Sequence, residues 1–144
     1  MTQQPSLPKV GIVILNFNCR DLLEGCVGSA LTQSYPNAAV WVVDNGSTDG
    51  SVDLVRTEFP QAELVQTNAN IGFAGLNMGI HKALDAGCRY IMYLDSDAKL
   101  DVSTISALVE YLMELITHDT CNGKQLPAPL GHCDLDRRNA IHQP

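Results

Sequence analysis

An apolar run with the composition of a buried strand occurs four times in this sequence, and a segment whose apolar residues have helical spacing follows each run. Strands that alternate with helices predict a mostly parallel sheet with helices on both faces, a three-layer α/β/α fold. The strands are expected at residues 9–16, 39–43, 62–67 and 90–94. The helices are expected at residues 21–33, 52–59, 73–84 and 102–116.

The pattern places a single domain at residues 9–117. Its first strand is almost continuously apolar and rich in β-branched residues, which is typical of a strand covered on both faces. Residues 1–8 contain two prolines and are expected to form a flexible leader. Because the pattern stops after the last helix, residues 118–144 are expected to form an irregular tail. The apolar stripe that should turn the third helix toward the sheet consists of Phe73, Leu76, Ile80, Ala83 and Leu84.

The charge of the chain excludes several classes of partner. Nine basic and sixteen acidic side chains give a formal net charge of −7, so nucleic acids and anionic membrane surfaces are poor partners. A ligand that carries phosphate would have to be held by backbone N–H groups or by a metal ion. No apolar run approaches the roughly 20 residues of a membrane-spanning helix. Five cysteines without a CxxC pair, and with no recognisable export signal, predict reduced thiols in a cytoplasmic protein.

Other chemistries fit the sequence less well. The histidines lie on a helix or in the tail, which excludes a Ser-His-Asp triad. The glycine-rich segment follows the third strand instead of the first, unlike a dinucleotide-binding site, and the first strand lacks the acidic pair of a phospho-receiver. A zinc site would need four residues whose spacing matches no usual structural pattern, so scattered tail residues are the favoured interpretation. These residues are His118, Cys121, His132 and Cys133.

Two acids after the fourth strand carry the sharpest candidate chemistry, because ligands of such sheets bind at the carboxyl ends of the strands. Asp95 and Asp97 are separated by one residue, so in an extended segment their side chains point to the same side. Neighbouring carboxylates repel each other unless a cation lies beside them, and Mg²⁺ and Mn²⁺ prefer such oxygen ligands. We therefore predict a Mn²⁺ or Mg²⁺ site that bridges to substrate phosphates, with a solvated turn as the alternative.

The other strand ends supply amides, glycines and one further acid. Asp44 ends the second strand, where its carboxylate can accept a hydrogen bond from a pyrimidine base or, alternatively, cap the loop that follows. Gly72 and the glycines after it permit close approach of the backbone to a ligand or of a helix to the sheet. Asn70 and Asn77 are candidate ligand contacts, with hydrogen bonding inside the turn and the helix as the alternative. The segment 48–51 is expected only to cap the next helix.

The order and spacing of these motifs resemble family 2 glycosyltransferases. The strand end Asn-Phe-Asn and the loop Asn-x-Gly-Phe-Ala-Gly are similar to the rhamnosyltransferase-like branch, whereas Asp-Ser-Asp is the form found more widely in the family. The resemblance covers about residues 9–117. It rests on the segments 10–18, 22–26, 34–37, 42–51, 70–79 and 95–97.

The resemblance implies a GT-A fold, in which a nucleotide-binding β/α half and an acceptor half share one sheet. It also implies inverting transfer from a nucleotide-diphosphate sugar, UDP- or dTDP-linked, to a glycan or a lipid-linked acceptor. By position, the first strand end and Asp44 would line the nucleobase, the loop 68–75 would flank the nucleotide, and Asp97 would bind the metal beside Asp95. The implied nucleotide-binding residues are Asn16, Phe17, Asn18, Asp44, Asn70, Gly72, Asn77 and Asp95.

Two functions fit this resemblance. One is an enzyme of cell-wall or polysaccharide biosynthesis, either cytoplasmic or peripheral at the inner face of the membrane. The other is a non-catalytic nucleotide-sugar-binding fragment or pseudoenzyme, because residues 118–144 do not resemble the acceptor half and no general base is identified. A chain that stops at the nucleotide-binding half would leave a sheet edge open, so self-association is also expected.

Overall fold

A sheet of four parallel strands, in the order β3-β2-β1-β4, organises the fold. The computed structural model describes residues 7–121, with side chains as far as Ile116. The strands are β1 (Val10–Asn16), β2 (Ala38–Asp44), β3 (Glu63–Gln66) and β4 (Tyr90–Asp95). The helices are α1 (Arg20–Leu31), α2 (Ser51–Glu58), α3 (Phe73–Asp85) and α4 (Thr104–Cys121).

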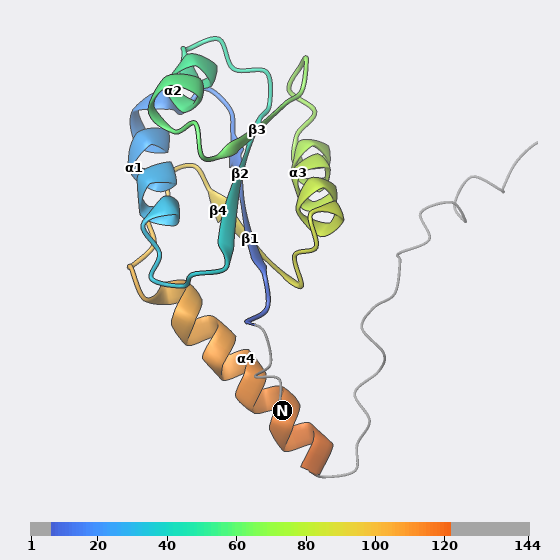
Figure 1. Ribbon diagram of the computed structural model, residues 1–144. Coiled ribbons are helices and arrows are strands. Elements are labelled where there is room, and N and C mark those ends of the chain that lie inside the picture. Colours follow the sequence, from blue (N-terminus) through green and yellow to red (C-terminus); the bar gives the residue numbers. More distant parts are fainter. Residues whose placement is uncertain (1–6, 122–144) are drawn as a thin grey trace, which may run out of the picture. The chain divides into compact units, whose positions relative to one another are not determined.

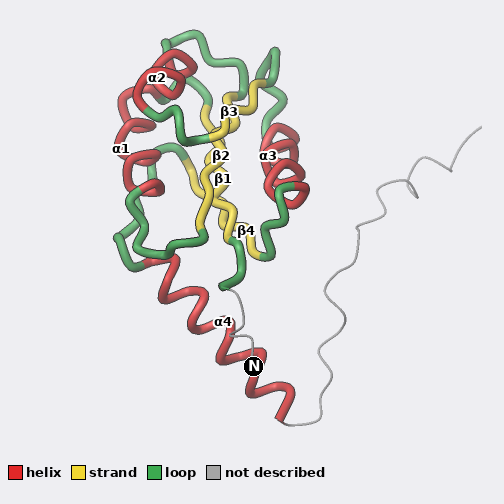
Figure 2. Tube along the Cα trace, viewed as in Figure 1, coloured by secondary structure: helices red, strands yellow, loops and turns green. Residues whose placement is uncertain are grey.

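Helices cover both faces of this sheet. Helices α1 and α2 lie on one face and α3 lies on the other (Figure 1), and the strands form the middle layer between them (Figure 2). In the central strand β1, Val13 and Ile14 point to opposite faces and are both fully buried. The predicted three-layer parallel arrangement and the buried first strand are therefore confirmed.

The strand register brings the polar strand ends to one edge of the sheet. Asn16 is the parallel partner of Asp44, and Leu15, next to it, is the partner of Asp95. Asp44 is in turn the partner of Gln66 on β3. We call this edge, where the strands end at Asn16, Asp44, Gln66 and Asp95, the strand-end edge.

Helix α3 packs on the sheet through part of the apolar stripe predicted for it, because Leu76, Ile80 and Ala83 contact the core. Its buried residues are Gly75, Gly79 and Ala83, whereas Phe73 and Leu84, both assigned to the buried stripe, are 70% and 49% exposed. A Cβ atom on Gly79 would lie 2.4 Å from Val43 Cγ2. The glycines allow the helix to approach the sheet closely, so the contacting face includes them and leaves Phe73 and Leu84, the two ends of the stripe, exposed.

Both boundaries of α4 also differ from the prediction, which placed this helix at residues 102–116. Helix α4 begins at Thr104 and continues to Cys121, five residues beyond the predicted end at Ile116. The apolar spacing ends near Ile116, but no glycine or proline interrupts the chain before Gly123, so nothing local stops the helix. The four residues considered as a zinc site all lie outside the residues whose side chains the structure describes. They are His118, Cys121, His132 and Cys133.

The chain forms two compact units, the first of which ends at Leu108. The first unit contains the sheet, α1, α2, α3 and the start of α4. None of the helices in the described part of the chain is both long and apolar enough to cross a bilayer.

Candidate functional site

A buried hydrogen-bond network joins the ends of β1 and β2. Asn16 is fully buried and Asp44 is 2% exposed. The Asn16 Nδ2 group donates to Asp44 Oδ1 at 3.0 Å and to Ser47 Oγ at 3.1 Å, and the Ser47 backbone N–H donates to Asp44 Oδ2 at 2.9 Å. A buried carboxylate is retained when such bonds compensate its lost hydration. The network therefore fixes a negative charge at the strand-end edge, and its Ser47 bond is the loop cap proposed as the alternative role of Asp44.

The same serine holds the loop between β1 and α1. The Asn18 backbone N–H donates to Ser47 Oγ at 2.9 Å, and Asn18 Oδ1 accepts from the Thr48 N–H at 2.8 Å. Asn18 has a left-handed backbone with φ 50°, which an asparagine tolerates better than most residues. Phe17, between the two anchored asparagines, is 44% exposed at the edge of the site.

A second buried asparagine holds the glycine-rich loop after β3. Asn45 is 2% exposed, and its Nδ2 group donates to Asn70 Oδ1 at 2.9 Å and to the Gly72 carbonyl at 3.1 Å. Its Oδ1 atom accepts from Thr67 Oγ1 at 3.0 Å and from the Ile71 N–H at 3.2 Å. These bonds bring the predicted residues Asn70 and Gly72 to the end of β2.

Two exposed carboxylates lie at the end of β4, at Asp95 and Asp97. The Tyr93 hydroxyl donates to Asp95 Oδ1, and the Cys26 thiol donates to the Asp95 carbonyl at 3.4 Å. Burial, and then the charges of Asp97 and Asp95, raise the pKa of Cys26 to about 12. Burial and the bond to Asp95, followed by the same two charges, raise the pKa of Tyr93 to about 12. Both carboxylates therefore act on the same small region.

The donor set fits a hard divalent cation in part. Asp95 and Asp97 offer exposed carboxylate oxygens, which are the ligands that Mg²⁺ and Mn²⁺ prefer. No group of three or more His, Cys, Asp or Glu residues in the described chain is arranged to hold a metal ion. A cation at this position would take further ligands from substrate phosphates and water, as Mg²⁺ commonly does.

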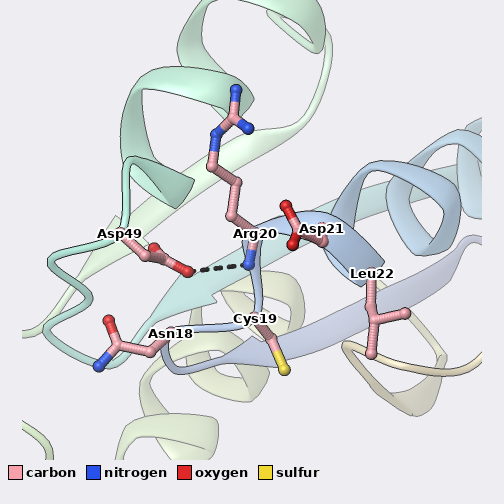
Figure 3. A pocket seen from close by; sticks show the side chains of 6 residues that line it. All are labelled: Asn18, Cys19, Arg20, Asp21, Leu22 and Asp49. Carbon is pink, nitrogen blue, oxygen red and sulfur yellow. Dashed lines mark hydrogen bonds between the residues drawn. The ribbon is translucent and has the colours of Figure 1, made fainter.

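An open pocket of about 670 Å³ adjoins the β1–α1 loop. Figure 3 shows Asn18 and Cys19 on the loop, Arg20, Asp21 and Leu22 at the start of α1, and Asp49 facing the Arg20 backbone from the β2–α2 loop. Of these residues, only Asn18 was predicted from the sequence to contact a ligand.

Asp49 caps two helices from this pocket. Its Oδ2 atom accepts from the backbone N–H of Arg20, the first residue of α1, at 2.9 Å. Its Oδ1 atom accepts from the N–H and the hydroxyl of Ser51, the first residue of α2. Burial by itself would raise the pKa of Asp49, but the bonds from Ser51 and Arg20 outweigh it and lower the pKa. The predicted cap on α2 is confirmed, and the bond to α1 is an addition.

The predicted site residues thus fall into three groups at one edge. Asn16, Asn18 and Asp44 are joined through Ser47, and Asn70 and Gly72 are joined through Asn45. Asp95 and Asp97 follow the neighbouring strand, and Asn77 lies exposed on α3.

Sequence reasoning gave no role to two residues that connect these groups. Asn45 directly follows Asp44, and Ser47 lies two residues further along the chain. The one available signal was an amide placed immediately after a continuous apolar strand, where the backbone is still buried.

The model of the family "Glycosyl transferase family 2" matches residues 11–121, which is most of the chain. The chain belongs to this family. Among family 2 relatives, the teichuronic acid biosynthesis glycosyltransferase TuaG of Bacillus subtilis is 32% identical over 142 residues, covering 95% of this chain and 54% of TuaG. The chain therefore spans about half the length of that relative.

Solved structures agree with the family 2 assignment at the level of the fold. S. aureus TarS (residues 1–349) superposes with a TM-score of 0.66 at 20% identity, covering 74% of this chain and 32% of TarS. The Pyrobaculum calidifontis mannosyltransferase PcManGT, solved with GDP-Man and Mn²⁺, gives 0.64 at 26% identity, covering 75% and 33%. The expected GT-A fold is confirmed for the described residues.

Proposed function

We propose that this chain binds a nucleotide-diphosphate sugar at the strand-end edge and serves inverting transfer of the sugar to an acceptor hydroxyl. The observation that carries the proposal is the gathering of three polar groups, around Asp44, Asn45 and Asp95, at the carboxyl ends of adjacent parallel strands. Ligands of open α/β sheets bind at this edge. Membership of glycosyl transferase family 2 supplies the reaction class.

The exposure of each residue divides the proposed nucleotide contacts into direct and indirect ones. Phe17 is exposed and offers an aromatic surface for the nucleobase, and Asn18 and Asn70 are exposed polar residues on the flanking loops. Asn16 is fully buried, so we propose that it positions Asp44 and does not itself contact the nucleotide. Asp44 is also buried, but it remains the proposed acceptor for the base because Asn16 and Ser47 use only one acceptor position on each of its carboxylate oxygens. Exposed Gly72 and Asn77 are proposed to flank the phosphates or the sugar.

Asp97, with Asp95, is the proposed holder of Mn²⁺ or Mg²⁺. A bound cation would neutralise the diphosphate as its negative charge grows on departure of the sugar. The acidic chain, with a net charge of −7, makes this neutralisation necessary for a diphosphate ligand. The neighbour PcManGT, solved with GDP-Man and Mn²⁺, supports the assignment.

The donor, the acceptor and the location are part of the same proposal. We propose a UDP- or dTDP-linked donor and a glycan or lipid-linked acceptor, in cell-wall or polysaccharide biosynthesis, because the relative TuaG is named for teichuronic acid biosynthesis. Cys19, Cys26 and Cys88 are free thiols, which supports the cytoplasm or the inner face of the membrane as the location.

Calorimetric titration of the full chain with UDP, dTDP and GDP tests the proposal. At least one nucleotide should bind with Mn²⁺ present, and chelation should lower the affinity by orders of magnitude. Asp97→Asn should reproduce the effect of the chelator, whereas Asp101→Asn, an exposed acid outside the strand end, should bind normally. Equal binding with and without Mn²⁺ would refute the metal assignment, and no binding of any nucleotide would refute the proposed function.

The second candidate function is nucleotide-sugar binding without transfer. The chain spans 54% of the length of TuaG, and no general base is assigned among the described residues. The two functions differ in one measurement, the release of nucleotide diphosphate from a bound sugar nucleotide in the presence of an acceptor. Turnover supports the enzyme, and binding without turnover supports the alternative.

A further inference from the structure

All hydrogen bonds of the Asn45 carboxamide are made with residues 67–72. A carboxamide has two N–H donors and an oxygen with two lone pairs, and all four positions are used on Thr67, Asn70, Ile71 and Gly72. We propose that Asn45 is a positioning residue that holds the loop of residues 68–75 in the conformation that receives the nucleotide. This inference rests on the proposed function, because it assumes that the loop flanks a nucleotide.

Apart from the bonds of Asn45, a non-local contact of the loop is the edge-to-face contact of Phe73 with Tyr93 on β4. Residues 68–74 are all exposed, and Gly72 has a left-handed backbone with φ 61°. Exposed, glycine-containing segments have much conformational freedom to lose on ordering. The internal bonds of the loop, such as the Gly72 N–H to Asn70 Oδ1 at 2.9 Å, are local, whereas the bonds of Asn45 tie the loop to the end of a buried strand.

Two glycines make room for this anchor. A Cβ atom on Gly75 would lie 2.9 Å from Asn45 Oδ1, and a Cβ atom on Gly46 would lie 2.9 Å from the Ala69 carbonyl carbon. Real Cβ atoms do not approach other atoms so closely. The carboxamide, the start of α3 and the loop therefore fit together only with glycine at both positions.

Asn45 acts indirectly, because it is buried and its carboxamide has no hydrogen-bonding position left for a ligand. It is also the immediate neighbour of Asp44, which binds Asn16 and Ser47 instead. Two consecutive residues at the end of β2 thus organise the two sides of the proposed nucleotide site, Asp44 on the β1–α1 side and Asn45 on the β3–α3 side.

The experiment compares Asn45→Ala with wild type in the full chain, with two readouts. Without nucleotide, the amide hydrogens of Ile71 and Gly72 should exchange at least about tenfold faster in the variant, while amides in β1 and β2 keep their protection. With Mn²⁺, the affinity for UDP or GDP, whichever wild type binds, should fall by about tenfold, the factor expected from one or two lost hydrogen bonds. Asn37→Ala, which removes a carboxamide bonded to the Leu7 carbonyl, is the matched control and should change neither readout.

The two readouts separate the ways in which the inference can fail. Unchanged exchange at Ile71 and Gly72 would show that Asn45 does not hold the loop. Faster exchange with unchanged nucleotide affinity would show that the held loop is irrelevant to binding, and would overturn only the role of Asn45. If wild type binds no nucleotide, the proposed function falls, and the binding role of Asn45 falls with it, whatever the exchange rates.

A second variant covers the case in which Asn45→Ala does not fold. Gly75→Ala leaves Asn45 in the chain but pushes a methyl group against its carboxamide, while alanine is the better residue for the helix itself. Faster exchange at Ile71 together with weaker nucleotide binding supports the inference. Wild-type behaviour in both readouts overturns it.

Discussion

A single buried carboxylate sets the electrostatics at the end of β2. Asp44 keeps its charge away from water because Asn16 and the Ser47 N–H each donate to one of its oxygens. Asn16 Oδ1 remains buried with no donor among the described residues, and such uncompensated groups are uncommon. The arrangement holds the charge rigidly, which suits a group that recognises a ligand.

Replacing this carboxylate separates its two proposed roles. Asp44→Ala should weaken UDP binding by about 1.5–3 kcal/mol, the range for a hydrogen bond to a charged group, and should leave Mn²⁺ occupancy unchanged. Calorimetry with UDP and with Mn²⁺ alone measures both. Ser47→Ala removes a hydroxyl from the same network but keeps the carboxylate, so its affinity should fall less. A folded Asp44→Ala variant that binds UDP like wild type would leave Asp44 as a loop cap only.

At the scale of elements, two features position the helices. One is the close packing of α3 on the sheet, and the other is the set of hydrogen bonds from one side chain to α1 and α2. Helix α3 touches the sheet through glycine, because Gly79 leaves space for Val43 and Val13. Helices α1 and α2 share one capping side chain, Asp49. Both features place a helix relative to the strand-end edge and so position the loops that carry the site.

The glycine contact predicts opposite effects of one substitution at two helical sites. In Gly79→Ala the new methyl would lie 2.4 Å from Val43 Cγ2 and 2.6 Å from Val13 Cγ1, and overpacking of this kind costs about 1–3 kcal/mol of unfolding free energy. Gly28→Ala meets nothing within 4 Å, so better helix propensity should stabilise by about 0.5–1 kcal/mol. Urea denaturation compares the two, and a Gly79→Ala variant as stable as wild type would contradict the close packing.

The shared cap predicts a pH-dependent loss of stability. Asp49→Ala should lower the free energy of unfolding by about 0.5–2 kcal/mol at neutral pH, the usual cost of a lost helix cap. The folded pKa of Asp49 lies below its ordinary value of 3.8. Its stabilisation is therefore complete above that value and is lost as the pH falls through the lowered pKa.

Unfolding curves at pH 7 and at ~pH 2.5 measure this dependence, and the gap between variant and wild type should narrow in acid. Asp53→Ala removes another acid from the first turn of α2 and should have a smaller effect. A gap that stays constant with pH would mean that the charge of Asp49 contributes nothing.

At the scale of the molecule, the sheet is covered unevenly. The central strand β1 has six buried residues of seven, whereas four of the six residues of β4 are half-buried. Strand β4 is also the last strand in the described order β3-β2-β1-β4. A terminal strand with open backbone groups and half-covered faces can pair with another chain.

We therefore expect the 144-residue chain to associate with itself as its concentration rises. Light scattering over a range of concentrations measures the association. A monomer at every concentration would contradict this expectation.

The sequence by itself determined the order of strands and helices, the parallel sheet and the positions of the polar strand ends. These features depend on local periodicity and on continuous apolar runs, which are properties of short stretches of sequence. The register then placed Asn16, Asp44 and Asp95 at one edge, as a parallel sheet requires.

Only the tertiary structure decided which groups act on each other. Asn45 accepts a hydrogen bond from Ile71, 26 positions away, and Asp49 accepts one from Arg20, 29 positions away. The sequence around either side chain does not indicate its partner. The exact face of α3 was decided in the same way, since Gly75 and Gly79 are buried against the sheet while Phe73 and Leu84, the two ends of the apolar stripe, are exposed. Van der Waals exclusion between distant segments, unlike periodicity, becomes defined only when the chain has folded.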